Sequence, residues 1–240
     1  MGKVLFNVVM FLPVIIFGCY EGRMIMETAP AAGSIENLET IQLTERSRFL
    51  VKQYGSVIRK HAEHYGLDWR LVMAVIEKES RFDPDAVSER GASGLMQITR
   101  STQCEIASEW GVDSAHFDRP HENIRGGIYY LSKIYKSFDA EHLSEEDRLS
   151  LTLAAYNAGL GRVQDAQAMA EYVNDNPNQW RCVRNALSLL SKKYATLHRH
   201  VWDTPRPPNG YFRDWKQTVQ YVDGVMKSYN ELRTYLPKRV

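Results

Sequence analysis

Apolar side chains recur at the three-and-four spacing of helices from residue 44 to near the C-terminus. The sequence shows neither the sustained alternation of a strand nor an internal repeat. Glycine, proline and polar clusters divide the pattern into consecutive segments. The pattern predicts an all-α domain over residues 44–240, with helices at 44–65, 68–83, 101–110, 124–134, 147–157, within 164–194 on either side of a break at 174–178, and around 218–226.

An acid lies on the apolar face of the helix expected at 68–83. Glu79 continues the apolar stripe of this helix at helical spacing. Glu77 lies about 200° round the helix and is expected to face water. Asp68 is a suitable N-cap, and the residue before Pro84 disfavours helix, so Glu79 falls in the last turns. The stripe consists of Val72, Val75 and Ile76.

The segment after this helix is rich in small residues that let the backbone approach other groups closely. Its run GASG occupies 91–94 and leads to Gln97. Burial on an apolar face raises the pKa of a glutamate from about 4.3 toward about 6 or above, so Glu79 would hold a proton near neutral pH. These features suit a general acid; the alternative is a carboxylate tied to a buried arginine or backbone amide.

Motifs in a fixed order carry a resemblance to a known family. They are Glu79-Ser80 with Ser88, the run Gly94-Leu95-Met96-Gln97, and the run Ala155-Tyr156-Asn157-Ala158-Gly159. Together they resemble the lytic transglycosylase domain of the soluble lytic transglycosylase type, a goose-lysozyme-like all-α fold with a groove that cleaves peptidoglycan strands. The likeness spans roughly residues 68–229. The likeness is strongest to the C-terminal domain of the membrane-bound branch F of this family. Proteins of that branch also have a large N-terminal domain that resembles a solute-binding protein, which is not expected here.

The resemblance implies a reaction and a set of site residues. Glu79 would act as catalytic acid and then base, cleaving the bond between N-acetylmuramic acid and N-acetylglucosamine and leaving 1,6-anhydro ends. The muramic acetamido group would assist, so no metal or cofactor is implied. The substrate-binding residues carried over from the family are Ser80, Ser88, Met96, Gln97, Tyr156, Asn157 and Tyr221.

Residue chemistry alone leaves part of this site open. Tyr156 and Tyr221 both lie on helical apolar stripes, where a tyrosine can simply belong to the core. Asp83 and Asp85 flank a turn in which solvation is expected, so the sequence offers one convincing acid, whereas glycosidases usually use two. Two rival functions therefore remain: a goose-type muramidase that adds water, and a non-catalytic peptidoglycan-binding protein.

Composition and charge narrow the class of protein. The 240 residues are 44% hydrophobic and 25% charged, as in a globular chain with one substantial core. The formal net charge of +1 gives no electrostatic case for nucleic-acid binding, which usually needs a concentrated basic face.

The first 18 residues are predicted to be a signal peptide. Lys3 precedes a mainly apolar run at 4–17 that is shorter than the roughly 20 residues needed to span a bilayer. The sequence before Cys19 resembles a lipobox, which implies lipidation of Cys19 and a periplasmic lipoprotein of the bacterial envelope, held at the outer membrane. Because Phe17 is bulkier than usual in this motif, ordinary signal cleavage is the alternative. Residues 19–43 are predicted to be a tether.

Cysteine and histidine usage suggests no metal site. If Cys19 is lipidated, Cys104 and Cys182 remain, either as a disulfide or as two buried free thiols. His61, His64 and the run 198–200 lack the thiolate or carboxylate partners of a plausible zinc site.

Three further segments give structural expectations. Residues 117–123 are predicted to be a polar loop, and Gly126-Gly127 to pack tightly against a neighbouring element. The proline-rich stretch 197–211 is predicted to be a long loop. Aromatic residues in or near this loop either stack on sugars or pin the loop to the domain; they are Trp202, Tyr211, Phe212 and Trp215.

Overall fold

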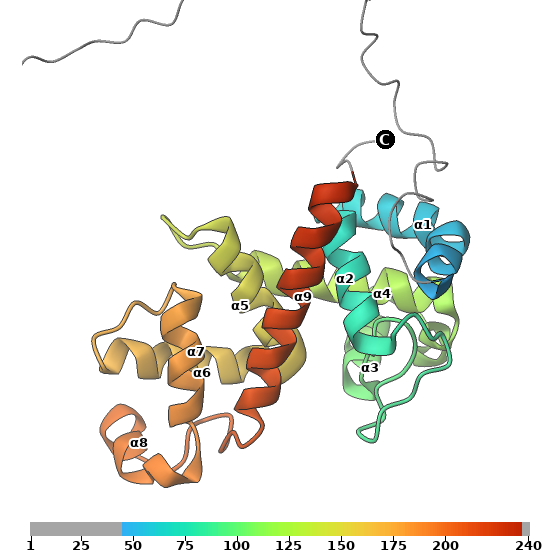
Figure 1. Cartoon of the computed structure of the whole chain (residues 1–240). Coiled ribbons are helices and arrows are strands. Elements are labelled where there is room, and N and C mark those ends of the chain that lie inside the picture. Colours follow the sequence, from blue (N-terminus) through green and yellow to red (C-terminus); the bar gives the residue numbers. More distant parts are fainter. Residues whose placement is uncertain (1–44, 237–240) are drawn as a thin grey trace, which may run out of the picture. The chain divides into compact units, whose positions relative to one another are not determined.

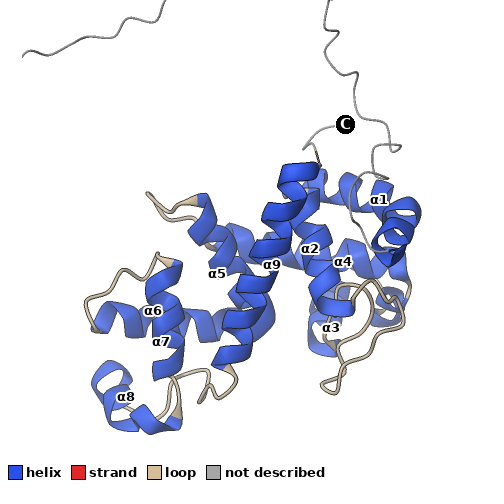
Figure 2. Ribbon diagram, in the orientation of Figure 1, coloured by secondary structure: helices blue, strands red, loops and turns tan. Residues whose placement is uncertain are grey.

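The computed structural model describes residues 45–236, so the predicted signal peptide, the tether and Cys19 lie outside the described part. Within this part the regular structure is helical, apart from two isolated β-bridges in the loop 81–99, which confirms the all-α prediction (Figure 2). None of the described helices combines the length and the apolar character needed to cross a membrane. The helices are α1 (Glu45–Tyr65), α2 (Trp69–Ser80), α3 (Arg100–Trp110), α4 (Pro120–Ser137), α5 (Glu145–Ala158), α6 (Leu160–Tyr172), α7 (Trp180–Leu189), α8 (Ala195–Trp202) and α9 (Trp215–Tyr235), with short 3₁₀ helices η2 (Ser114–Asp118) and η3 (Lys192–Tyr194).

Helix α2 is buried along most of its length, with every residue from Trp69 to Ile76 buried. As predicted, Asp68 caps its start by accepting a hydrogen bond from the backbone N–H of Arg70 at 3.0 Å. The buried Arg70 guanidinium pairs with the Asp68 carboxylate at 2.6 Å and donates to the carbonyl oxygen of Leu236 at 2.7 Å. These bonds tie the first turn of α2 to the end of α9.

Helix α9 joins two groups of helices. It packs against α2 on one side and against α5 on the other (Figure 1). Helices α1 and α4 pack together beside α2, whereas α6 and α7 pack together beyond α5. Side chains of α9 can therefore reach residues of both groups.

The end of α2 differs from the prediction. The helix stops at Ser80, three residues before Asp83, because Arg81 and Phe82 both adopt left-handed backbone conformations with φ of 51° and 63°. Glu79 still falls in the last turn, as expected. Such conformations cost a residue with a side chain about 1–2 kcal/mol each, so the surrounding structure has to hold this turn.

Two predicted loops are partly helical. Residues 117–123 belong to η2 and to α4, which starts at Pro120, a favourable residue for a first helical turn; Phe117 is fully buried. Helix α8 extends to Trp202, so the irregular part of the predicted 197–211 loop begins only at Asp203, two residues before the first proline.

The aromatic residues near this loop pin it to the domain. Phe212 is buried, and Trp202 and Trp215 pack against the core. The Tyr211 hydroxyl donates to the carbonyl oxygen of Pro205 at 3.0 Å. These contacts favour the structural role over sugar stacking.

The structure also shows the surroundings of Phe49, Gly161 and two cysteines. Phe49 of α1 is 64% exposed, although it is a large apolar side chain. Gly161 lies inside α6, where the missing side chain leaves room for Asn209. Cys104 and Cys182 are free thiols, the first exposed and the second buried, so the disulfide alternative is not realised.

The glycine pair in α4 packs tightly, as predicted. A Cβ on Gly126 would lie 2.7 Å from the Phe117 ring, and one on Gly127 would collide with the Met96 side chain. Since Met96 lies in the loop after α2, this close approach fixes that loop against α4.

We expect Gly127→Ala to lower the free energy of unfolding by about 1–3 kcal/mol, because the added methyl overpacks the Met96 contact. Chemical denaturation followed by circular dichroism measures the change. The matched control is Gly55→Ala in α1, where the new Cβ meets Val51 at an ordinary 3.4 Å. This control should be neutral or stabilising by up to about 1 kcal/mol, and equal losses in the two variants would contradict the packing argument.

Candidate active site

The site is built around Glu79, which the apolar stripe of α2 carries toward α9. Tyr221 of α9 donates its hydroxyl hydrogen to the Glu79 carboxylate, with 2.7 Å between the oxygens. Tyr221 is buried, and Glu79 is half-buried. Of the residues that the structure describes, none forms an ion pair with Glu79.

The environment of Glu79 favours its protonated form. Burial raises the pKa of Glu79 from its ordinary value of 4.5 to about 7, while the Tyr221 hydrogen bond and the nearby Lys78 charge oppose this rise. Burial and the neighbouring Glu79 charge also raise the pKa of Tyr156 and of Tyr221 well above the ordinary value. Both tyrosines therefore remain hydrogen-bond donors while Glu79 exchanges its proton near neutral pH.

Tyr156 reaches the site from α5 and fixes the loop that follows α2. Its hydroxyl donates to the backbone carbonyl oxygen of Met96 at 2.7 Å, and no hydrogen bond joins it to Glu79. Its pKa nevertheless responds to the Glu79 charge, which places the two groups within electrostatic reach of each other. Tyr156 and Tyr221 are therefore more than core residues, because the hydroxyl of each donates a specific hydrogen bond.

The motif residues in the loop 81–99 stabilise the conformation of the loop itself. Gln97, with φ of 48°, donates its side-chain amide to the carbonyl oxygens of Ala86 and Gly94 at 2.9 and 3.0 Å. Ser88 accepts the backbone N–H of Ala92 at 3.0 Å. Met96 is fully buried, and its side chain packs against Gly127 of α4.

Ser80 and Asn157 differ in their access to solvent. Ser80 is buried, and its hydroxyl donates to the carbonyl oxygen of Ile76 at 3.1 Å within α2. Asn157 is exposed, and its side-chain oxygen accepts from the Thr218 hydroxyl of α9 at 2.8 Å, which leaves its amide N–H₂ directed elsewhere. Of these two residues, Asn157 is therefore the one placed to contact a ligand.

Asn123 is a positioning residue that the sequence analysis missed. It is 1% exposed; its side-chain oxygen accepts from the Met96 N–H at 2.9 Å, and its amide donates to the Ser93 carbonyl oxygen at 3.0 Å. Gly94 makes room for it, since a Cβ there would lie 2.6 Å from the Asn123 side-chain carbon. A single asparagine in a polar segment gave no signal of this role.

The loop is also joined to the start of α9 at the surface. Arg90 pairs with Asp214 at 2.6 Å, although both side chains are substantially exposed. Such an exposed pair contributes at most about 1 kcal/mol and can open readily.

Among residues 45–236, no second carboxylate contributes to the raised pKa of Glu79, and no metal site is found. Asp83 and Asp85 are exposed in the turn after α2, where Asp83 accepts the backbone N–H of Asp85 at 3.0 Å. No group of three or more histidine, cysteine, aspartate or glutamate side chains in this range is arranged to hold a metal ion. The arrangement thus offers one proton-exchanging carboxylate supported by tyrosines.

Comparison with known sequences finds relatives that share this region. Membrane-bound lytic murein transglycosylase F of Desulfosudis oleivorans is 33% identical over 204 residues, covering 85% of this chain and 41% of the relative. Membrane-bound lytic murein transglycosylase F 1 of Alkalilimnicola ehrlichii is 37% identical over 182 residues, covering 75% of this chain and 33% of the relative. Both names agree with the branch that the sequence motifs indicated, and the chain spans less than half the length of either relative.

Solved structures share the fold. An inactive mutant of lytic transglycosylase Slt from Pseudomonas aeruginosa aligns with a TM-score of 0.52 and 23% identity over 86% of this chain and 29% of its own. The 70 kDa soluble lytic transglycosylase from Escherichia coli aligns with a TM-score of 0.54 and 21% identity over 80% of this chain and 26% of its own. The fold is therefore the expected lysozyme-like helical fold. The family model described as the transglycosylase SLT domain matches residues 56–179, and the chain belongs to this family.

Proposed function

We propose that this protein is a peptidoglycan lytic transglycosylase with Glu79 as its catalytic residue. The observation that carries the proposal is a half-buried glutamate with a pKa of about 7, bonded to Tyr221 and without an ion-pair partner among the described residues. A carboxyl group with this pKa can give up a proton and take one back near neutral pH. Membership of the transglycosylase SLT family supports the same chemistry.

The first step is protonation of the glycosidic oxygen between N-acetylmuramic acid and N-acetylglucosamine. The Glu79 O–H transfers its proton to this oxygen as the bond to C1 of the muramic sugar breaks. The muramic acetamido oxygen stabilises the positive charge that develops at C1. Tyr221 then stabilises the Glu79 carboxylate that results, because its hydroxyl already donates to that oxygen.

The second step closes the sugar ring on itself. The Glu79 carboxylate removes the proton from the muramic 6-hydroxyl, whose oxygen forms the new bond to C1. The product is a 1,6-anhydro end, Glu79 regains its proton, and no water is consumed. One carboxyl group suffices for both steps, which agrees with the exposed positions of Asp83 and Asp85. A muramidase of the inverting type would need a second base on the opposite side of the sugar.

Asn157 and the loop 81–99 are proposed to line the substrate side of Glu79. The exposed amide of Asn157 can donate to a sugar or acetamido oxygen. The other residues carried over from the family are proposed to position the site. Backbone conformation is stabilised by Ser80, Ser88, Met96 and Gln97. Tyr156 holds the loop through its hydrogen bond to Met96.

The proposed location is the periplasmic side of the bacterial envelope, where the substrate lies. The two relatives named above are called membrane-bound, and lipidation of Cys19 remains the predicted means of attachment. Peptidoglycan strands are the proposed partner.

We expect Glu79→Gln to lower the rate of strand cleavage by at least about 100-fold, because the amide keeps the shape of the side chain but cannot transfer the proton. Mass spectrometry of fragments released from purified peptidoglycan measures this, and wild-type fragments should be lighter by one water than hydrolysed ones. The matched control, Glu63→Gln on the exposed face of α1, should cleave normally.

Each of three results would contradict this assignment. Cleavage retained by Glu79→Gln would remove Glu79 from the chemistry. Reducing ends that carry an added water would identify a muramidase. A folded wild-type protein that releases nothing would favour a binding protein.

The alkaline limb of the pH profile of kcat/KM should report the loss of the Glu79 proton near pH 7. Because the Tyr221 hydroxyl stabilises the carboxylate, Tyr221→Phe should raise the Glu79 pKa further and shift this limb to higher pH by up to about one unit. The control is Tyr229→Phe, which removes an α9 tyrosine that donates to Asp68 at 3.2 Å. Identical limbs in wild type and Tyr221→Phe would show that Tyr221 does not control the proton.

Stability should depend on the same proton. The pKa of Glu79 in the folded state lies above its unfolded value of 4.5. The contribution of this bound proton to the free energy of unfolding is therefore complete below pH 4.5 and is lost as the pH rises through about 7. Since glutamine does not titrate, wild type should lose about 1–3 kcal/mol relative to Glu79→Gln across this interval. Urea denaturation at a series of pH values measures the difference, and parallel curves would refute the raised pKa.

A further inference from the structure

A buried threonine of α9 lies on the same face of that helix as Tyr221. Thr218 precedes Tyr221 by three residues, and at about 100° per residue this spacing places both side chains on one side of α9. Thr218 is 1% exposed. Tyr221 donates to Glu79 of α2 at 2.7 Å, and Thr218 donates to the side-chain oxygen of Asn157 of α5 at 2.8 Å. One face of α9 therefore presents a hydrogen-bond donor to each of two residues that the proposed function uses.

The surroundings of Thr218 direct its hydroxyl hydrogen to Asn157. A threonine within a helix commonly donates to the carbonyl oxygen four residues earlier, which here belongs to Asp214. That oxygen already accepts the backbone N–H of Gln217 at 2.9 Å and the backbone N–H of Thr218 at 3.4 Å. Because a carbonyl oxygen has two lone pairs, the Asp214 oxygen is already saturated and the hydroxyl donates to Asn157 instead.

This hydrogen bond determines which end of the Asn157 amide group faces away from α9. Only the oxygen of an asparagine amide accepts a hydrogen bond, whereas its N–H₂ donates. Since Thr218 engages the oxygen and Asn157 is exposed, the N–H₂ is the end that remains for a ligand. An amide group turned through 180° would offer the ligand an acceptor instead of two donor hydrogens.

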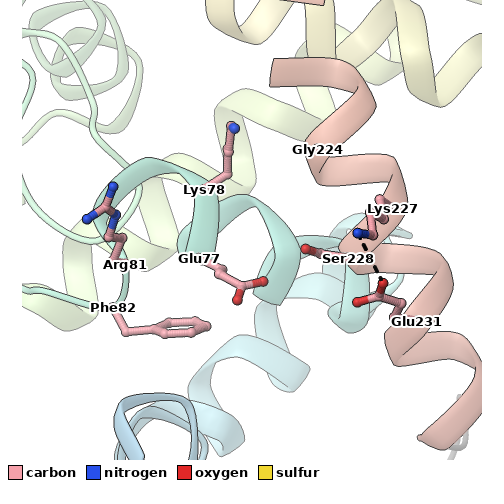
Figure 3. A pocket seen from close by; sticks show the side chains of 8 residues that line it. All are labelled: Glu77, Lys78, Arg81, Phe82, Gly224, Lys227, Ser228 and Glu231. Carbon is pink, nitrogen blue, oxygen red and sulfur yellow. Dashed lines mark ion pairs between the residues drawn. The ribbon is translucent and has the colours of Figure 1, made fainter. Parts of the chain in front are cut away.

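Thr218 belongs to a helix that is held against its neighbours. Val225, two turns further along α9, is fully buried. On the side of α2, a Cβ on Gly224 would lie 3.1 Å from the amine of Lys78, which extends between the two helices (Figure 3). Glu77 on this side of α2 is half-buried, although the sequence predicts that it faces water. The Thr218 hydroxyl therefore has a fixed position, and the amide group has to turn to meet it.

We propose that Thr218 is a positioning residue that orients the Asn157 N–H₂ toward the acetamido oxygen of a bound sugar, an inference that rests on the proposed function. An acetamido oxygen only accepts hydrogen bonds, so it needs a donor at this place. Without the threonine hydroxyl, the amide group turns freely and presents its oxygen as often as its N–H₂. Thr218 thus strengthens strand binding without touching the strand.

The kinetic test removes the hydroxyl and keeps the shape of the side chain. Thr218→Val of the full-length protein is assayed on purified peptidoglycan beside Thr218→Ser, which retains a hydroxyl. We expect kcat/KM to fall about tenfold in Thr218→Val, mainly through KM, and less than about threefold in Thr218→Ser.

The matched control is Thr152→Val in α5. It removes another fully buried threonine hydroxyl, which donates to the carbonyl oxygen of Arg148 at 2.7 Å within the same helix. We expect this control to change kcat/KM less than about twofold. Equal losses in Thr218→Val and Thr152→Val, or no loss in Thr218→Val, would overturn the proposal.

A double-mutant cycle separates positioning from a general effect on the structure. In an Asn157→Ala background, Thr218→Val should change kcat/KM less than about twofold, because no amide group is left to orient. Asn157→Asp keeps an acceptor for Thr218 but lacks the N–H₂, so it should lose about tenfold in kcat/KM. Losses that multiply in the double variant, or Asn157→Asp that cleaves like wild type, would overturn the proposal. Since Asn157 is exposed, Asn157→Asp tests the proposal even where Thr218→Val does not fold.

Direct binding separates this proposal from the proposed function. Full-length Glu79→Gln, with and without Thr218→Val, is titrated by calorimetry with soluble glycan strands whose peptides an amidase has removed. We expect Thr218→Val to raise Kd about tenfold. Equal Kd values would overturn the role of Thr218, even where the wild type cleaves strands. A raised Kd together with a wild type that cleaves no strand would support the role of Thr218 and refute the transglycosylase.

Discussion

The contact between α2 and α9 holds a carboxyl group where water is partly excluded and where no cation of residues 45–236 forms an ion pair with it. The apolar stripe of α2 carries Glu79 into this contact, and burial raises its pKa to about 7. Tyr221 donates a hydrogen bond to one carboxyl oxygen of Glu79. Because the tyrosine hydroxyl carries no charge, this bond does not force Glu79 to lose its proton. The resulting group is neutral or ionised according to small changes in its surroundings, which is the property that a single acid and base requires.

This contact depends on the anchoring of both helices. At the first turn of α2, the buried Arg70 guanidinium links Asp68 to the carbonyl oxygen of Leu236 at the end of α9. Tyr229 of α9 donates to the same Asp68 carboxylate. Burial of Asp68 raises its pKa, but the hydrogen bonds and charge of Arg70 outweigh this and leave the pKa below its ordinary value. The two carboxyl groups at the ends of α2 therefore differ: Asp68 forms an ion pair that lowers its pKa, whereas Glu79 forms none among the described residues and exchanges its proton near pH 7.

The loop after α2 is held from several elements. Asn123 of α4 bonds to the backbone at Met96 and Ser93, and Tyr156 of α5 bonds to the carbonyl oxygen of Met96. Gly127 lets the Met96 side chain approach α4 closely. Through these bonds, helices far apart in the sequence determine where the loop lies relative to Glu79.

The sequence alone predicted the all-α class, the positions of most helices and the place of Glu79 in the last turn of α2, because helical periodicity and capping are local properties. It could not place Asn123, whose role depends on contacts 27 and 30 residues away in the sequence. The tertiary structure alone brought Tyr221 of α9 to Glu79 of α2, and Tyr156 of α5 to the loop at Met96. The physical reason is that these elements lie far apart in the sequence, and periodicity within one helix does not specify its neighbour.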